Sequence, residues 1–265
     1  MVAIRDLSLI YSLSRGGMAP ALSRINAQFE EGKISALIGP SGCGKTSLIR
    51  IMAGLLEPSE GAVTLRGKAV LGVCKTTAVI FQDYGLLPWK TVQANAELPL
   101  RIAGRKDRRE RAGALLLEFG LAGFENRYPR ELSGGMKQRL AIVRALAAEP
   151  ELLLMDEPFS SLDALTREDA QDFLLSVTRR RRLTVVIVTH SIEEAVYLAD
   201  SVYVMTGKNP GTLETRLDIS RYGPEIAPAG FREEPRFREY CAALRSLLKA
   251  GPLSDTGPAL GGRVP

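Results

Sequence analysis

The stretch Gly39-Pro-Ser-Gly-Cys-Gly-Lys-Thr46 lies between two apolar segments. The run Ile34–Ile38 before it has the composition of a buried strand, and Leu48–Ala53 after it has that of a helix. In this setting the pattern G-x-x-x-x-G-K-[ST] indicates a phosphate-binding loop. Its glycines let backbone N–H groups converge on phosphate oxygens, and the following helix points the positive end of its dipole at the same place.

Two side chains of this loop carry specific roles. Lys45 can reach the β- and γ-phosphates as a point charge, and Thr46 can offer its hydroxyl to Mg²⁺. The alternative interpretation is a glycine turn followed by an incidental Lys-Thr pair. On the first interpretation, the expected nucleotide contacts are Gly39, Pro40, Ser41, Gly42, Cys43, Gly44, Lys45, Thr46 and Ser47.

Composition sets broad limits on the class of protein. A chain of 265 residues suits one large α/β domain or two lobes on one core. No apolar run approaches the roughly 20 residues that span a bilayer, and the first residues lack the features of a signal peptide. The three cysteines have no metal-site spacing, which fits a reducing cytoplasm. A formal charge of +5 is compatible with a membrane face, nucleic acid or a nucleotide, and does not choose among them.

Four apolar runs in the chain each end at polar residues. Continuous aliphatic runs are typical of parallel strands covered on both faces, and ligands bind beyond the carboxyl ends of such strands. One parallel sheet would therefore gather these polar residues around the phosphate loop. The runs are Ile34–Ile38, Ala78–Ile80, Leu152–Met155 and Thr184–Val188, and the polar residues after the last three are Gln82, Asp156, Glu157 and His190.

The charge and reach of these four side chains suggest roles. Asp156, directly after a buried strand, is placed to hold Mg²⁺ or its water. Glu157 points differently by strand alternation and can polarise a water aligned with the γ-phosphorus. Gln82 can offer its amide oxygen to Mg²⁺ and sense the γ-phosphate. His190, the one histidine of the chain, is expected beside the γ-phosphate. The alternatives are a structural histidine and a solvated strand end.

A second, antiparallel sheet is expected from period-two alternation near the N-terminus. Val2 with Ile4, Leu7 with Leu9, and Ile25–Phe29 alternate in this way, as do residues 62–71. Tyr11 ends the first pair of these strands. Its ring can stack on an adenine, or it can simply pack at a strand end, and position alone favours neither.

Residues 86–150 are rich in Leu, Ala, Arg and Glu and are expected to form an inserted helical lobe. Arg108–Phe119 has helical spacing within it. Near its end, Leu132-Ser-Gly-Gly-Met-Lys-Gln-Arg139 precedes another helical pattern. Ser133 is a good helix N-cap, and the glycines after it expose backbone N–H groups at the helix start, which makes a second anion site. Such a site on a separate lobe would most simply serve the nucleotide of another subunit.

With these motifs in order, the chain resembles the ATP-binding subunit of ABC transporters over residues 1–206. Leu132–Arg139 is similar to the signature motif of that family. The other matching elements are Tyr11 as the aromatic adenine loop, Gly39–Thr46 as Walker A, Gln82 as the Q-loop, Leu152–Glu157 as Walker B with its glutamate, Ser160–Asp163 as the D-loop and His190 as the switch histidine.

This resemblance implies the fold and the chemistry. The fold is α/β: a P-loop NTPase core with a parallel sheet, an antiparallel β subdomain and an inserted helical signature lobe. Two copies would pair head to tail and hold two ATP molecules, each between Gly39–Thr46 of one copy and Ser133, Gly134 and Gly135 of the other. Glu157 would be the hydrolytic base, and Asp163 would communicate across the interface. Ser161, where relatives often carry Ala, is a small departure.

The segment Asp83–Val92 follows the expected γ-phosphate sensor and contains the one tryptophan. In the family, this region lines the groove that receives a coupling helix of the membrane subunit. An exposed apolar patch beside a nucleotide sensor is what a coupled partner needs. The alternative is a core tryptophan. The string Leu86–Trp89 resembles importers of the nitrate, sulfonate and taurine group.

The last third of the chain carries weaker signals. Arg179–Arg182 is expected to end a helix, with a solvated charged face as the default and attraction to anionic lipid as the alternative. Residues 207–249 form an extension with one amphipathic helix that packs on the core, and residues 250–265 are expected to be a disordered tail. The short extension leaves no room for a separate regulatory domain.

The sequence therefore predicts an ATPase, dependent on ATP and Mg²⁺, that powers a membrane importer of a small solute of the oxyanion or organic-anion type. It would sit at the cytoplasmic face of the membrane, bound to permease subunits near Gln82–Val92 and indirectly to a solute-binding protein. A soluble ABC-type ATPase of nucleic acid or ribosomes is the alternative, but a long coiled-coil insertion and a second cassette are both missing. A phosphate-loop kinase gives no reason for Ser133–Arg139.

Overall fold

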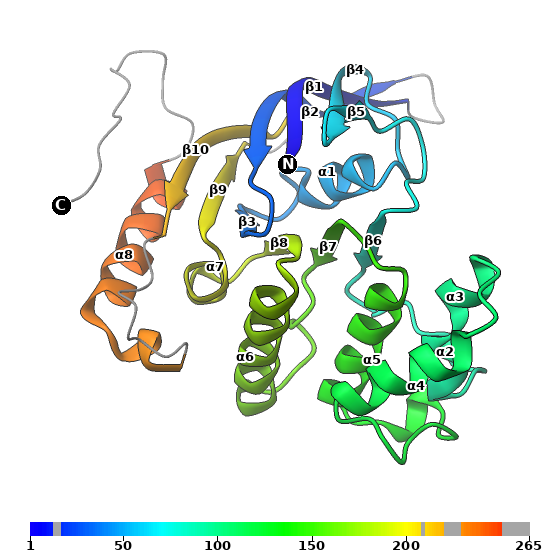
Figure 1. Cartoon of the computed structure of the whole chain (residues 1–265). Helices are drawn as coiled ribbons and strands as arrows, with labels where there is room; N and C mark the ends of the chain where they lie inside the picture. The colour runs from blue at the N-terminus through cyan, green and yellow to red at the C-terminus, as the bar shows by residue number, and fades with distance from the viewer. Residues whose placement is uncertain (13–16, 208–209, 220–228, 251–265) are drawn as a thin grey trace.

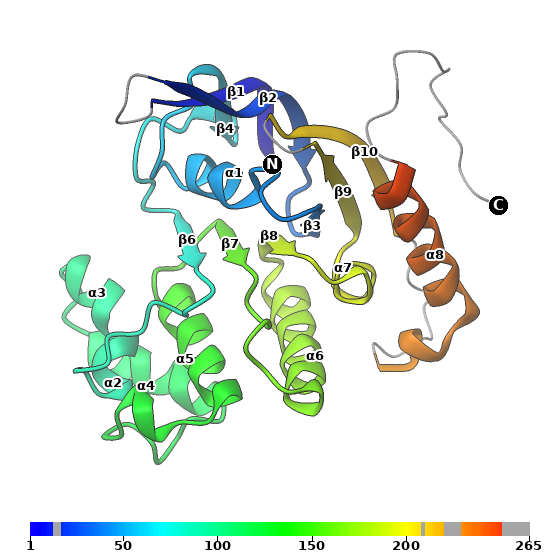
Figure 2. The same cartoon turned by 180° about the vertical axis from the view of Figure 1, so that it is seen from behind.

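The computed structural model of the chain describes residues 1–12, 17–207, 210–219 and 229–250. A six-stranded sheet crosses the middle of the molecule, with a smaller sheet and α1 on one face and helices on the other (Figures 1 and 2). A lobe of helices extends from the end of the sheet where β6 lies. Residues 251–265 of the predicted tail lie outside the described residues.

The larger sheet contains the four predicted parallel strands as neighbours, in the order β3-β8-β7-β6. This arrangement confirms the parallel core inferred from the apolar runs. Two further strands, which the sequence analysis did not include, complete the sheet beside β3, one parallel and one antiparallel. The strands are β3 (Ile34–Ile38), β6 (Thr77–Ile80), β7 (Leu152–Asp156), β8 (Thr184–Thr189), β9 (Ser201–Thr206) and β10 (Thr212–Asp218).

The smaller sheet is antiparallel, as predicted, in the order β2-β1-β4-β5. The two short strands expected before Tyr11 are one continuous strand. That strand changes register between Ile4 and Leu7, and Asp6 there has a positive φ of 45°. The irregularity keeps both apolar pairs on the buried face, which explains why each looked like a strand of its own. The strands are β1 (Val2–Ser12), β2 (Met18–Phe29), β4 (Glu60–Leu65) and β5 (Lys68–Ala69).

The helices divide into three groups. Helix α1 (Lys45–Met52) follows the phosphate loop. The lobe contains α2 (Val92–Ala96), α3 (Leu98–Ile102), α4 (Arg108–Glu118), the 3₁₀ turn η1 (Pro129–Glu131) and α5 (Gly134–Ala147). The remainder are α6 (Ala164–Arg181), α7 (Ile192–Leu198), the 3₁₀ turn η2 (Ala229–Glu233) and α8 (Pro235–Ala250).

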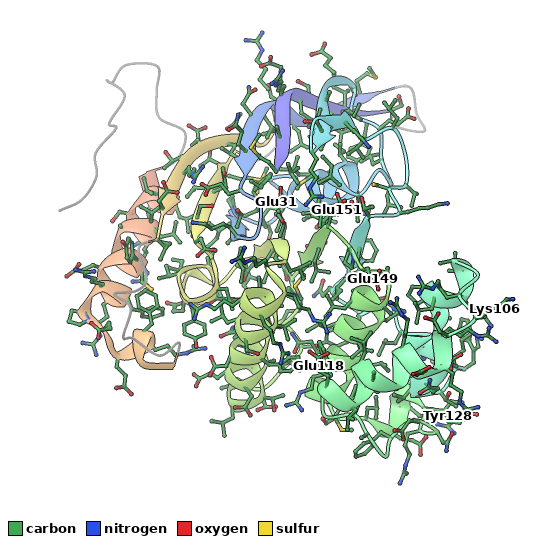
Figure 3. The ribbon with its side chains drawn as sticks, viewed as in Figure 1. Glu31, Lys106, Glu118, Tyr128, Glu149 and Glu151 are labelled. Atoms are coloured by element: carbon green, nitrogen blue, oxygen red, sulfur yellow. The ribbon has the colours of Figure 1, made fainter. Side chains whose placement is uncertain are left out.

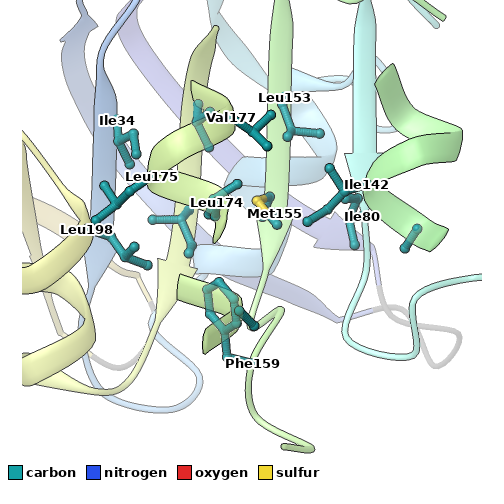
Figure 4. Close-up of a cluster of buried hydrophobic side chains, with 14 of the residues drawn as sticks. Ile34, Ile80, Ile142, Leu153, Met155, Phe159, Leu174, Leu175, Val177 and Leu198 are labelled. Atoms are coloured by element: carbon teal, nitrogen blue, oxygen red, sulfur yellow. The ribbon is translucent and has the colours of Figure 1, made fainter. Parts of the chain in front are cut away.

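Strand alternation splits the buried side chains into two cores. Ile34, Ala36 and Ile38 of β3 pack with α5, α6 and α7, whereas Leu37 packs with α1 and the small sheet. The strands β7 and β8 alternate in the same way. The core on the α5–α7 face brings together side chains from β3, β6, β7 and the helices (Figure 4). Because both faces are covered, the strand ends are held in fixed positions relative to one another.

The lobe is tied to the rest of the molecule by charged side chains. Glu118 at the end of α4 lies where the lobe meets α6 (Figure 3). It forms ion pairs of 2.8 Å with Arg180 and 2.6 Å with Arg181. Part of the arginine run predicted to be a solvated face therefore binds this lobe, and the helix ends at the run as predicted.

In the described parts of the chain, no helix is both long and apolar enough to cross a membrane. The three cysteines, Cys43, Cys74 and Cys241, are free thiols. Burial raises the pKa of the Cys43 thiol, which lies inside the phosphate loop.

Candidate functional site

A pocket of about 490 Å³ opens where β1 and β2 meet the phosphate loop. Residues of β1 and β2 form one part of its wall, and the phosphate loop, the start of α1 and Glu157 form the rest. It is lined by Tyr11, Ala19, Pro20, Ala21, Ser41, Gly42, Gly44, Lys45, Thr46, Ser47 and Glu157. The structure therefore brings Tyr11, much of the predicted phosphate loop and the predicted base Glu157 to one cavity.

Two glycines of the loop are required by its shape. Gly44 caps α1 with a φ of 90°, in the left-handed region, and a Cβ there would lie 2.5 Å from Leu22. A Cβ on Gly39 would lie 2.4 Å from the carbonyl oxygen of Met205. The loop therefore fits between β2 and β9 because these two positions carry no side chain.

Lys45 is held in place by the loop that it follows. Its Nζ donates to the carbonyl oxygens of Gly39 at 2.8 Å and Pro40 at 2.9 Å, and the residue is almost fully buried. These contacts fix the ammonium group at the wall of the pocket and reduce the conformational freedom that it must lose on binding an anion. Cys43 is fully buried, so its side chain does not face the pocket.

Thr46 and Asp156 place two oxygen donors together at the start of α1. The Thr46 hydroxyl acts on the carboxyl of Asp156, the last residue of β7. Burial raises the pKa of Asp156, while the Thr46 hydroxyl and the charges of Arg50 and Lys45 oppose that shift. A hydroxyl and a carboxylate are the hard ligands that Mg²⁺ takes when phosphates supply the rest, so the donor set fits the ion. No group of three or more His, Cys, Asp and Glu suited to a metal is found among the described residues.

Glu157 leaves the strand in a strained conformation. Its φ is 47°, which is uncommon for a residue other than glycine. Its amide donates to the carbonyl of Val188 at 2.9 Å, so the turn is anchored to β8. His190, just after β8, places Nδ1 3.2 Å from Oε2 of Glu157. The side chain of Glu157 is 27% exposed and that of His190 is 64% exposed, so both are open to a ligand.

Gln82 lies in the exposed turn directly after β6. Because Ile80 is paired with Met155 of β7, this turn is next to the end of β7. The turn is held from behind by Arg144 of α5, which donates to the carbonyls of Tyr84 at 2.8 Å and Gly85 at 2.5 Å. Burial lowers the pKa of Arg144. The sequence analysis missed Arg144 because its contacts are with residues far away in the chain.

Ser133 caps α5, as predicted, by accepting a hydrogen bond from the amide of Met136 at 3.3 Å. Gly134 and Gly135 lie against Leu162 and the first turn of α6, where an added Cβ would meet side chains at 2.8 Å. Among the described residues that line the pocket, Ser133 and these glycines are absent. Helix α5 also packs on the opposite face of the sheet from α1.

The carboxylate of Asp163 caps α6 and accepts a hydrogen bond from the amide of Thr166 at 3.1 Å. The hydrogen bonds from Thr166 lower the pKa of Asp163. In the same loop, the hydroxyl of Ser161 lies 3.0 Å from that of Tyr84, so the turn of Gln82 and the loop before α6 are in direct contact.

Glu194 is a buried acid close to this site that the sequence analysis missed. It lies in the first turn of α7, and both Thr189 and the charge of Arg167 on α6 act on its carboxyl group. Burial raises the pKa of Glu194 to about 7. The pattern Ser191-x-x-Glu194 signals a helix start, but nothing in it signals burial.

The segment after Gln82 presents an aromatic side chain to solvent. Asn95 of α2 is fully buried, and its amide bonds to the backbone of Leu87 in both directions and to the carbonyls of Lys90 and Thr91. On this fixed loop, Trp89 is 70% exposed. The core position considered for Trp89 is therefore wrong.

Comparisons with known proteins agree with this geometry. Residues 22–160 match a family model described as ABC transporter. The chain is 40% identical over 259 residues to a nitrate import ATP-binding protein, NrtD, of Synechocystis sp., covering 96% of this chain and 97% of that protein. It is 42% identical over 229 residues to a taurine import ATP-binding protein, TauB, of Yersinia pseudotuberculosis, covering 83% and 89%. A dimeric ATP-binding cassette, MJ0796, bound to ADP and phosphate, matches with a TM-score of 0.73 at 30% identity, over 84% of this chain and all of that one.

Proposed function

The chain belongs to the ABC transporter family, and we propose that it is the ATP-binding subunit that energises the import of a small anion. As an ATP-binding member of that family it is an ATPase, which converts ATP and water to ADP and phosphate and couples that reaction to transport. Its relatives NrtD and TauB carry import names for nitrate and taurine, which supports a solute of the oxyanion or organic-anion type. These relatives give no support to a role on nucleic acid or ribosomes.

Binding of the triphosphate is assigned to the pocket beside α1. The backbone amides of residues 39–47 and the ammonium of Lys45 would contact its phosphates. Tyr11, whose hydroxyl lies 3.0 Å from that of Ser47, lines the same pocket at the position expected for the base. Thr46 and Asp156, with Gln82, would hold Mg²⁺, which supplies charge neutralisation at the β- and γ-phosphates when it is bound.

Hydrolysis is assigned to Glu157. Its carboxylate is partly exposed at the mouth of the pocket, where it can take a proton from a water as that water attacks the γ-phosphorus. The positive φ of Glu157 and the hydrogen bond of its amide to Val188 turn the chain away from the direction of β7 at this residue. His190, at 3.2 Å, would orient the carboxylate and contact the γ-phosphate.

The observation that carries the two-copy arrangement is the separation of two anion sites within one chain. The phosphate loop lines the pocket, whereas Ser133, Gly134 and Gly135 begin a helix on the other face of the sheet. At the start of α5, Ser133 caps the helix and Gly134 is exposed, so a phosphate can approach the positive end of the helix dipole. A second copy, turned head to tail, would bring its Ser133–Gly135 onto the triphosphate, with Asp163 near the shared interface.

The permease contact is assigned to the loop from Gln82 to Val92. Trp89 is exposed on a loop whose backbone is held by Asn95, so a partner meets a preformed surface. The Tyr84–Ser161 contact links that loop to the residues just before α6. We place the subunit at the cytoplasmic face of the membrane through this contact, with a solute-binding protein acting through the permease.

The test is the variant Glu157→Gln. It keeps the size of the side chain but removes the base, so phosphate release is expected to fall by about 10²–10⁴-fold while ATP still binds. Light scattering should then show a dimer that forms with ATP and separates without it. Glu57→Gln, an exposed position far from the pocket, is the matched control and should behave as wild type.

Two results would contradict the proposal. Steady-state hydrolysis retained in Glu157→Gln would show that another group is the base. Failure of that variant to pair at any ATP concentration would show that the second copy does not complete the site.

A further inference from the structure

The C-terminal segment formed by η2 and α8 has no role in the function proposed so far. It is firmly attached: Phe231 is fully buried and meets Phe237 edge to face, with ring centres 5.5 Å apart. Cys241 and Leu244 are buried in the core shared with α7. Helix α8 lies at the edge of the molecule opposite the helical lobe and packs beside α7 and β9 (Figures 1 and 2).

One side chain of this segment reaches between two helices of the catalytic core. The guanidinium carbon of Arg232 lies 3.6 Å from the ring centre of Tyr197 on α7. Its Nη2 donates to the amide oxygen of Gln171 on α6 at 2.7 Å, and its Nη1 is 3.8 Å from Glu168 on α6. A cation over an aromatic ring is bound more strongly when it is shielded from water, and the Arg232 side chain is only 24% exposed.

Tyr197 itself also ties α7 to α6, and a second contact joins α8 to α7. Tyr197 is fully buried, and its hydroxyl donates to Asp172 of α6. Farther along α8, Arg245 lies 3.2 Å from Glu193, which also accepts a hydrogen bond from Ser191, the cap of α7. Arg245 and Glu193 are about half exposed, so that contact is weak alone. Arg232 is therefore a side chain that contacts both α6 and α7 from the C-terminal segment.

Both helices at this junction begin at residues of the candidate site. Helix α6 starts at its cap Asp163, and α7 starts directly after His190. Helix α7 is seven residues long, and its first residue, Ile192, is two residues after His190, so a tilt of α7 at Tyr197 also displaces the segment that holds His190. His190 contacts Glu157 at 3.2 Å, and a displacement of about 1 Å at such a contact is enough to slow a reaction markedly.

We propose that Arg232 is a positioning residue, which fixes α7 against α6 and thereby sets His190 against Glu157. The C-terminal segment is then part of the catalytic apparatus, although it lies outside the pocket. This inference rests on the ATP hydrolysis proposed above. It predicts an effect on turnover and not on ATP affinity, because Arg232 touches neither the phosphate loop nor Tyr11.

The test compares three variants of the full-length chain. Arg232→Met keeps an apolar stem over Tyr197 but removes the charge and the donors. Its kcat is expected to fall about 10- to 100-fold with KM for ATP within about 2-fold of wild type. Arg232→Lys keeps the cation and should recover part of kcat. Arg238→Met is the control, since Arg238 is exposed and makes no ion pair or hydrogen bond with the residues that the structure describes.

A second measurement does not depend on turnover. Amide hydrogen exchange without nucleotide should become faster in residues 189–196 of Arg232→Met, with residues 39–52 unchanged. The positioning role is wrong if wild type hydrolyses ATP and Arg232→Met has the same kcat as wild type. It is also wrong if kcat falls in Arg232→Met and KM for ATP changes with it. If wild type itself does not hydrolyse ATP, the proposed function fails, and the exchange of residues 189–196 still decides for or against the link.

Discussion

Glu157 and Glu194 show how the environment of single residues shapes the site. Glu157 is placed by a backbone turn with positive φ and is partly open to solvent. Glu194, in the first turn of α7, is only 7% exposed. One carboxylate is therefore free to meet water, while the other is held in a setting that disfavours its charge.

The pKa of Glu194, raised to about 7 by burial, makes stability depend on pH. The folded chain keeps a proton on this acid that the unfolded chain releases at lower pH. Its contribution to stability is full below about pH 4.5 and is lost as the pH rises through about 7. In wild type we expect the free energy of unfolding to fall by up to about 3 kcal/mol between about pH 5 and pH 8 because of Glu194. The variant Glu194→Gln should not show this fall.

Urea unfolding at several pH values measures this effect. Glu193→Gln, at the exposed neighbouring position of the same helix, is the control and should keep the pH dependence of wild type. An identical pH dependence in Glu194→Gln and wild type would mean that Glu194 is not the group responsible.

At the scale of elements, the loop between β6 and α2 has the features of a surface that binds a partner protein. The side chain of Asn95 bonds to the backbone of this loop from the inside, and Trp89 faces outward from it. Trp89 is exposed there without a covering element among the described residues. Large aromatic side chains of this kind commonly carry much of the binding energy of an interface.

Trp89→Ser is therefore expected to weaken the complex with the permease by about 2 kcal/mol, or about 30-fold in affinity. The measurement is titration of the purified permease, in detergent, with wild-type or variant subunit. Leu71→Ser serves as the control because Leu71 is 91% exposed in another loop, between β5 and β6. Equal affinity of Trp89→Ser and wild type would move the docking surface elsewhere.

At the scale of the whole molecule, the helical lobe and the core meet through both apolar and charged contacts. The rings of Phe119 and Phe173 lie edge to face at 4.9 Å, next to the ion pairs of Glu118. The Arg180 and Arg181 side chains are 58% and 36% exposed, so water and salt screen those pairs. Orientation of the lobe therefore depends on a weak charged tie beside a stronger apolar one.

We expect Glu118→Gln to lower the free energy of unfolding by less than about 1 kcal/mol, and the difference to vanish at about 1 M salt. Amide exchange should become faster in α4. Glu110→Gln, exposed on the same helix, is the control. A loss of free energy of unfolding that exceeds about 3 kcal/mol, or that persists at high salt, would contradict this expectation. It would show that the ion pairs are buried and that the variant leaves Arg180 and Arg181 without a partner for their charge.

Much of the fold followed from local patterns. The apolar runs predicted the parallel strands, and the patterns at Ser133 and Arg108–Phe119 predicted helices of the lobe. The strands β9 and β10 were missed, and β1 was divided in two. Strand β9 was missed because residues 201–206 are not followed by a polar residue of catalytic type, which was the signal used for the other strands. Strand β1 was divided because the bend at Asp6 interrupts the alternation on which strand prediction depends.

By itself, the sequence determined the phosphate loop, the strands that end at Gln82, Asp156 and His190, and the capped start of α5. These depend on the chemistry and the spacing of neighbouring residues. Only the tertiary structure decided that His190 lies against Glu157, that Trp89 is exposed, that Glu194 is buried and that Arg232 links α6 to α7. The physical reason is that burial and side-chain contact depend on which distant segments pack together, and no local pattern in the chain carries that information.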